Sequence, residues 1–312
     1  MPEWLYEAGI GEARAALVDD GAIVEAAIEL DGLRLGTVAR GRLVELIPGG
    51  MGVVALDAGE ALLTHIPPGI TQGALLTVEI VREAIPEPAR PKLARARATD
   101  AAPAAGPDLL ARLAASGIAV RQCRAHQPDA LEAAGWSELL DEAITGDIVF
   151  AKGALRMSPT PAMTLFDVDG PAPIEPLAIA AARSVALAIR RHRIGGSIGI
   201  DFPTLGGKAT RQAVADAIDA HLPPPFERTT VNGFGFLQIV RPRPRASLPE
   251  LVRSDPVGIA ARAALRRIER EPPGAPRAHR LPATVIAWLN ARPALLAELA
   301  RRTGVVHRLE TA

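Results

Sequence analysis

Turn signals divide the first 81 residues into short apolar segments, and this spacing strongly limits the fold of that region. Residues 14–29 hold two apolar runs on either side of Asp20-Gly21, a dipeptide typical of a tight hairpin. Later segments are separated by glycine- and proline-rich turns such as Pro67-Pro68-Gly69. The predicted strands cover 36–39, 41–47, 52–56, 60–66 and 75–81. Five short strands predict a small barrel or sandwich, with an OB-type barrel as the natural candidate.

Composition limits the kind of core and the cellular setting. Apolar residues make up 48% of the 312 residues, but aromatic residues only 3%, so the cores must be aliphatic. The single cysteine, Cys123, excludes disulfides within the chain and cysteine-rich zinc sites. The N-terminus has no apolar leader, and the apolar stretch 177–189 is short and contains Arg183. We therefore expect a cytoplasmic protein with no membrane partner.

The remainder of the chain predicts alternating strands and helices after a linker. Residues 84–107 contain five prolines, which indicates a boundary between domains. Periodicity over 155–240 predicts the order β-β-α-β-α-β-β, an α/β sheet layer. Shorter elements are predicted as helices over 109–116, 137–142, 248–253, 259–269 and 283–299, and as strands over 118–121, 147–151 and 305–309.

Two aspartates each end an apolar strand. Asp167 lies in the run Met163–Asp169, and Asp201 lies in the run Gly196–Phe202. A carboxylate at a strand end loses solvation unless something pairs with it. Because one helix separates the strands, both strand ends should lie at the same sheet edge. There Asp167 and Asp201, with Asp169 on the same side, could hold one Mg²⁺ ion. Alternatively, the two aspartates cap the helices that follow.

Positive charge gathers in the C-terminal part of the chain. From Arg183 onward there are 21 basic and 10 acidic residues. This surplus favours a polyanionic partner, and solvated helix faces are the alternative. Arg241, Arg243 and Arg245 alternate with prolines, which predicts an extended basic segment that is either an RNA backbone contact or a solvated tail.

Two further basic residues have competing interpretations. His192 ends a predicted helix, where cations are favoured; helix capping is the first interpretation and RNA contact the second. Gly206-Gly207-Lys208 lacks the full spacing of a P-loop, so Lys208 is a candidate phosphate ligand only.

Segments in the right order along most of the chain resemble the ribonuclease E/G family. They are Leu155–Gly170, Ile194–Phe202 and Thr230–Arg243, together with the hairpin 14–29, the run Gly36–Gly49 and Val54–Gly59. The resemblance implies a mixed α/β fold with an N-terminal hairpin, an inserted OB-type RNA-binding barrel, a nuclease core of the ribonuclease H-like or DNase I-like kind, and a small helical C-terminal region. The implied domains are 1–34, 35–98, 108–152, 153–246 and 247–312, of which 108–152 would be a reduced sensor segment.

The resemblance also implies site residues. The family's magnesium-binding aspartates align with Asp167 and Asp201, whereas Asp169 stands where the family usually has asparagine. Arg121 aligns with an arginine of the family's pocket for a 5′-monophosphate. Lys92 aligns with a basic RNA contact at the exit of the barrel.

The chain departs from the family in several places. The RNA-stacking aromatics expected near Ala55 and over 62–64 are absent, and stacking contributes about 1–3 kcal/mol per base. No cysteine pair follows Arg253, so we expect neither zinc nor a zinc-linked tetramer, but a monomer or dimer. The stretch from Arg121 to Asp167 is also much shorter than in typical members.

The sequence therefore predicts an enzyme, a Mg²⁺-dependent endoribonuclease that cleaves single-stranded RNA in RNA processing or decay. The alternative hypothesis is a catalytically weak or inactive RNA-binding protein that retains the ribonuclease E/G fold. A third hypothesis is an unrelated α/β phosphoesterase. It requires that the resemblance of the N-terminal barrel region to the family arose by chance.

Overall fold

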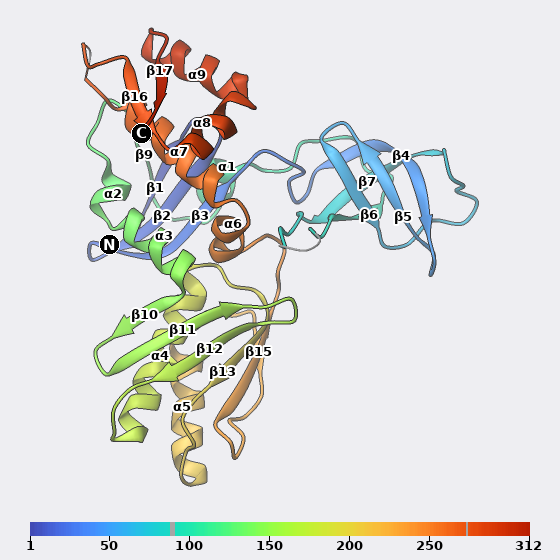
Figure 1. Cartoon of the computed structure of the whole chain (residues 1–312). Coiled ribbons are helices and arrows are strands. Elements are labelled where there is room, and N and C mark those ends of the chain that lie inside the picture. Colours follow the sequence, from blue (N-terminus) through green and yellow to red (C-terminus); the bar gives the residue numbers. More distant parts are fainter. Residues whose placement is uncertain (88–90, 273) are drawn as a thin grey trace. The chain divides into compact units, whose positions relative to one another are not determined.

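The computed structural model of the chain describes residues 1–87, 91–272 and 274–312 (Figure 1). The chain forms two compact units, each built from segments that are distant in sequence. The first unit contains residues 1–31, 109–136 and 252–312, and the second contains 32–108 and 137–251. The range 108–152, predicted as one domain, is thus divided between the two units. Among the described residues, no helix combines the length and the apolarity needed to cross a bilayer.

A four-stranded sheet is the centre of the first unit. Its strands, in spatial order, are β3 (Ala22–Glu29), β2 (Ala13–Asp19), β1 (Glu3–Ala8) and β9 (Val120–Gln122). Asp20 and Gly21 join β2 to β3 with φ values of 49° and 77°. Both turn residues of a type I′ hairpin need positive φ, so the predicted hairpin is confirmed.

Helices from two parts of the sequence complete the first unit. They are α1 (Leu109–Ala114), α2 (Ala130–Ala133), α7 (Pro256–Glu269), α8 (Ala283–Asn290) and α9 (Pro293–Thr303), with the strand pair β16 (Ala278–Leu281) and β17 (Arg308–Thr311). The prediction of one helix over 283–299 is wrong, because α8 ends before Pro293 and α9 begins there. Proline lacks the N–H that a continuous helix needs, but it suits a first helical turn.

A buried cluster of charges joins β1, β2, α2 and α7. Arg14 on β2 is fully buried, and it donates to Glu7 Oε2 at 2.7 Å and to Asp129 Oδ2 at 2.6 Å. Arg270, directly after α7, donates to Glu7 Oε1 at 2.6 Å. Burial alone would raise the pKa of Asp129, but the nearby charge of Arg14 outweighs it, so this pKa lies below its usual value.

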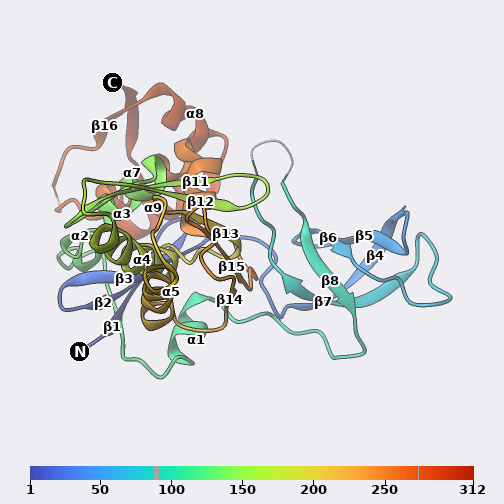
Figure 2. The same cartoon turned by 90° about the horizontal axis from the view of Figure 1, so that it is seen from below.

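A closed five-stranded barrel forms part of the second unit (Figure 2). Its strands are β4 (Val38–Ile47), β5 (Met51–Leu56), β6 (Gly59–Leu63), β8 (Ala94–Ala98) and β7 (Leu75–Arg82), in the order around the barrel. The predicted small barrel is confirmed. The segments predicted separately over 36–39 and 41–47 are one strand, since Gly41 lies inside β4, where a Cβ atom would be 2.7 Å from the carbonyl oxygen of Ala55.

The last barrel strand lies in the segment that the sequence predicts as a linker. Within β8, Ala94 and Ala96 are buried, whereas Arg95 and Arg97 are exposed. This alternation has the period of a strand, and alanine is small enough for the inner wall of a narrow barrel. The linker prediction over 84–107 is therefore wrong for residues 94–98.

A six-stranded sheet forms the rest of the second unit. Its spatial order is β10 (Asp147–Phe150), β11 (Gly153–Pro159), β12 (Thr164–Asp169), β13 (Gly196–Asp201), β15 (Phe236–Arg241) and β14 (Glu227–Arg228). The helices α4 (Ile174–Arg191) and α5 (Lys208–His221) follow β12 and β13. The predicted β-β-α-β-α-β-β order over 155–240 is confirmed.

Helix packing distinguishes the two faces of this sheet. Phe166, Ile198, Ile200 and Leu237 belong to one apolar core with the alanine-rich face of α4 and the buried residues of α5. Because side chains alternate along a strand, their neighbours project from the opposite face. We refer to that opposite face as the open face.

The C-terminal end of α4 is held by a second charged contact. His192 is fully buried, and its Nε2 lies 2.7 Å from Oε1 of Glu142 on α3 (Trp136–Thr145). Arg191 Nη2 donates to the same oxygen at 2.5 Å. The interpretation of His192 as an RNA contact is wrong because its ring is not accessible. The chain continues into α6 (Leu248–Ser254), at the boundary of the two units.

Replacing Arg14 with alanine should lower the free energy of unfolding of the first unit by about 3 kcal/mol, because buried carboxylates lose their cation. All three tryptophans, Trp4, Trp136 and Trp288, lie in this unit, so their fluorescence during urea unfolding reports on it. The matched control is Arg121→Ala, which removes an exposed pair with Glu3 and should change stability by less than about 1 kcal/mol.

The difference in the free energy of unfolding between wild type and Arg14→Ala should become smaller at acidic pH. Since the folded pKa of Asp129 is depressed, its contribution is present above pH 3.8 and is lost as pH falls through the lower folded value. Equal urea midpoints for Arg14→Ala and Arg121→Ala at neutral pH would contradict a stabilising role for this cluster.

Candidate functional site

The structure brings Asp167 and Asp201 together. β12 and β13 are parallel neighbours, and the two aspartates are register partners across this pair. Adjacent strands lie about 4.8 Å apart, so the two Cβ atoms start from neighbouring positions. This is the arrangement that the strand-helix-strand spacing predicts.

The aspartates project from the open face of the sheet. Phe166, Val168 and Ile200 lie in the apolar core, so Asp167, Asp169 and Asp201 lie on the other side, and all three are exposed. The helix-capping alternative is wrong. The residues that cap α4 and α5 are Pro173 and Gly207, which lie several residues beyond the aspartates.

A row of side chains crosses the open face at the level of the two aspartates. Arg156 on β11 is the register partner of Asp167, and its Nη2 lies 3.3 Å from Asp147 Oδ1. Phe236 on β15 is the register partner of Asp201. The carboxylate pair is therefore flanked by a guanidinium on one side and an aromatic ring on the other.

An apolar floor adjoins the carboxylates. A Cβ atom at Gly199 would lie 2.7 Å from the ring of Phe236 and 2.8 Å from the Leu165 side chain. Both side chains therefore lie over Gly199, where only glycine leaves enough room. The ring and the leucine side chain form an apolar surface beside Asp201.

An exposed phenylalanine lies in the turn before β15. The side chain of Phe234 is 86% exposed, and Asn232 Oδ1 accepts hydrogen bonds from the backbone N–H groups of Phe234 and Phe236. The N–H of Phe202 donates to the carbonyl of Gly235 at 3.2 Å, so the turn lies beside the end of β13. Sequence reasoning missed both phenylalanines. The available signal was an aromatic between two glycines, Gly233 and Gly235.

Lys208 lies on the same edge of the sheet as Asp201. It is exposed and is the first residue of α5, which begins after the loop 202–207 that follows β13. Backbone N–H groups at a helix N-terminus attract anions. Lys208 thus combines its own charge with that of the helix end.

The predicted basic segment does not reach the carboxylate pair. Arg241 is opposite Gly196, five register positions from Asp201, which is about 17 Å along the strands. Arg243 forms an ion pair with Glu250, and Arg245 Nε lies 2.8 Å from Glu83 Oε1. Carboxylates therefore neutralise much of this segment.

The remaining predicted cations also have acidic neighbours. Lys92 Nζ lies 2.5 Å from Glu87 Oε1 in the second unit. Arg121 is on β9 of the first unit, where its Nε lies 3.1 Å from Glu3 Oε2. Each arrangement makes the cation part of a surface ion pair.

The carboxylate pair offers two side-chain ligands, so a magnesium ion held there would keep most of its waters. Among residues 1–87, 91–272 and 274–312, no group of three or more histidine, cysteine, aspartate or glutamate side chains could hold a metal. Mg²⁺ is usually held by only one or two carboxylates. Like charges directly opposite each other in a sheet are destabilising, and a cation between Asp167 and Asp201 would remove that cost.

Comparison with protein-family models and with curated proteins gives no match to this chain.

Replacing Asp201 with asparagine should have opposite effects with and without metal. In EDTA, Asp201→Asn should raise the free energy of unfolding by about 0.5 kcal/mol, because it removes like-charge repulsion. In millimolar Mg²⁺ the wild type should gain stability that the variant does not. Thermal unfolding followed by circular dichroism, with titration calorimetry of MgCl₂, measures both effects.

Asp57→Asn, in an exposed turn of the barrel, is the matched control and should respond to Mg²⁺ as the wild type does. An equal response to Mg²⁺ in wild type and Asp201→Asn would exclude the pair as the metal site.

Proposed function

We propose that the chain is a Mg²⁺-dependent endoribonuclease acting on single-stranded RNA, with Asp167 and Asp201 as its metal ligands. The observation that carries this proposal is their register pairing on the open face. The ordered resemblance of the sequence to the ribonuclease E/G family also supports it. On this proposal the six-stranded sheet is the nuclease core.

The residues around the pair suit a nucleic acid strand. Mg²⁺ bound there would activate a water molecule and neutralise charge on a phosphodiester. Phe234 and Phe236 offer rings on which bases can stack, a contact that tolerates any base sequence. Arg156, beside Asp167 in the sheet, and Lys208, at the start of α5, can contact the phosphates that flank the cleaved bond.

The barrel is proposed to hold the RNA by charge. Its strand order, first-second-third-fifth-fourth, supports an OB-type barrel. Arg82 and Arg95 are register partners on β7 and β8. Burial lowers the pKa of Arg82, and so do the charges of Arg95 and Arg243. Arg82 and Arg95 thus place two guanidinium groups on neighbouring strands. A polyanionic backbone would relieve this repulsion.

Cleavage of a 5′-fluorescent, unstructured RNA oligonucleotide tests the proposal. In Mg²⁺, Asp167→Asn and Asp201→Asn should each slow cleavage about 100-fold or more, because each loses a metal ligand. Asp57→Asn, purified in parallel, should cleave at the wild-type rate and so controls for contaminating nuclease. Wild-type cleavage by Asp167→Asn would show that the site assignment is wrong.

The barrel contact can be tested separately in EDTA, where the RNA stays intact. Fluorescence anisotropy should show weaker binding for Arg95→Gln, with a slope of log affinity against log salt reduced by about 0.7 for one lost phosphate contact. Arg97→Gln is the matched control on the same strand, because Arg97 already pairs with Glu79 at 2.7 Å. A larger loss for Arg97→Gln than for Arg95→Gln would contradict the proposed path.

A second candidate function is RNA binding without cleavage. Departures from the ribonuclease E/G pattern favour it. The barrel lacks aromatics at the positions where the family has them, and the stretch from Arg121 to Asp167 is shorter than in typical members. Salt-sensitive RNA binding with no calorimetric signal for Mg²⁺ and no cleavage would support this candidate over the enzyme.

A further inference from the structure

A cavity of about 1160 Å³ lies within the first unit, in a part of the chain that the proposed nuclease does not use. Its walls come from the end of β1, the segment after β9, the segment after α7, and the region from the end of α9 to His307. Pockets for small molecules and cofactors commonly occupy about 300–1,000 Å³, so this cavity has room for more than a simple ion.

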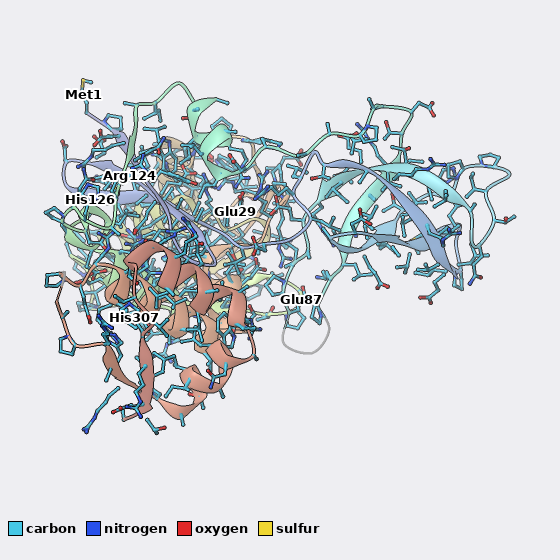
Figure 3. The ribbon with its side chains drawn as sticks, turned by 90° about the horizontal axis from the view of Figure 1, so that it is seen from above. Met1, Glu29, Glu87, Arg124, His126 and His307 are labelled. Carbon is cyan, nitrogen blue, oxygen red and sulfur yellow. The ribbon has the colours of Figure 1, made fainter. Side chains whose placement is uncertain are left out.

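One wall of the cavity is a turn held by Arg270. The Nη1 atom of Arg270 donates to the carbonyl oxygen of Gln127 at 2.9 Å, and lies 3.3 Å and 3.4 Å from those of Arg124 and Ala125. The backbone of the turn is thereby fixed before any ligand arrives. Arg124 and His126 extend from it with exposed side chains (Figure 3).

Each acidic side chain that lines the cavity lies beside a basic side chain. Glu7 is paired with Arg14 and Arg270, as described above. Glu269 Oε1 lies 3.1 Å from Nη1 of Arg302, and Glu271 Oε1 lies 3.5 Å from Nδ1 of His279. Two of the three carboxylates that line the cavity, those of Glu7 and Glu269, are therefore already paired with arginines.

Three basic side chains of the cavity remain without such a partner. Within the ranges 1–87, 91–272 and 274–312, the side chains of Arg124, His126 and Arg277 form no ion pair with a carboxylate. The cavity thus carries an excess of positive charge. Guanidinium groups bind phosphate through two parallel hydrogen bonds, which makes arginine the usual residue for this ligand.

A chain of hydrogen bonds fixes the wall opposite the turn. Thr303 Oγ1 donates to the carbonyl of Leu299 at 2.8 Å, so it accepts from Nε2–H of His307 at 2.9 Å. His307 Nδ1 then accepts from His279 Nε2–H, also at 2.9 Å. Burial lowers the pKa of His307, and the nearby His279 and Arg277 lower it further. This direction agrees with a neutral His307 ring in the series of hydrogen bonds. The positive charge for a ligand therefore comes from the arginines.

We propose that this cavity binds an organic phosphate of nucleotide size, with Arg124 and Arg277 contacting the phosphate and His126 at its side. Tyr6, Ile268, Pro272 and Val305 add apolar surface to the same cavity, which suits the flat part of a nucleotide. A bare anion would fill only a small part of the volume.

Titration calorimetry of the full chain with adenosine 5′-monophosphate tests the proposal. EDTA in the buffer keeps metal-mediated binding at Asp167 and Asp201 out of the measurement. Adenosine and inorganic phosphate are titrated in parallel, and the nucleotide should bind more tightly than either. Arg124→Gln and Arg277→Gln should each weaken nucleotide binding about 10-fold or more, because each removes a charge-assisted hydrogen-bond donor.

Two control variants show whether the nucleotide binds in this cavity or elsewhere on the chain. Arg280→Gln removes an exposed arginine of β16 that is outside the cavity, and it should bind the nucleotide as the wild type does. Asp201→Asn should also bind normally, since the cavity and the carboxylate pair lie in different units. Tryptophan fluorescence during urea unfolding shows whether the first unit of each variant is folded.

Three outcomes would overturn the proposal. They are the absence of binding at millimolar nucleotide, wild-type affinity in both Arg124→Gln and Arg277→Gln, and adenosine or inorganic phosphate binding as tightly as the nucleotide. None of these outcomes bears on RNA cleavage, so this proposal and the ribonuclease proposal can fail separately.

Discussion

The complete burial of Arg14 is the constraint on which the first unit depends. A guanidinium without water needs carboxylates within hydrogen-bond reach, and these come from β1 and from the residue that caps α2. Arg270 reaches the same carboxylates from the end of α7, so the two ends of the sequence share one charge cluster. The same Arg270 holds the turn that carries Arg124 and His126. The electrostatics of the core and the shape of the cavity therefore have a common origin.

In the second unit, the alternation of side chains along β12 and β13 decides what the sheet can do. Phe166 and Ile200 must face the helices, and this sends Asp167 and Asp201 to the open face as register partners. A slip of one residue would place a carboxylate in the apolar core, so the register is strongly specified. The apolar floor of Leu165 and Phe236 exists because position 199 has no side chain. The same alternation of side chains thus forms both the apolar core and the candidate site.

Local patterns predicted much of the secondary structure. Asp20-Gly21 and the strand-helix alternation over 155–240 were sufficient because turn chemistry and periodicity act over a few residues. Predictions failed where packing overrides local preference. Prolines around Ala94–Ala98 indicated a linker, yet closure of the barrel makes these residues a strand. The single helix predicted over 283–299 failed for a local reason, because Pro293 begins a new helix where apolar periodicity alone would continue the first. Arg241 and Arg243 were predicted to form a basic segment, but sheet register and Glu250 determine their surroundings.

The sequence by itself determined the hairpin, the presence of a small barrel, the α/β layer and the meeting of Asp167 with Asp201, since each follows from short-range spacing. The fifth strand of the barrel, β8, was decided by closure of the barrel. Only the tertiary structure decided which carboxylates are neutralised and where cations gather. Those facts depend on contacts between residues such as Arg14 and Asp129, or Arg270 and Glu7, that lie more than 100 positions apart. The cavity has the same dependence: no stretch of the chain encodes it, because four separate segments form its walls.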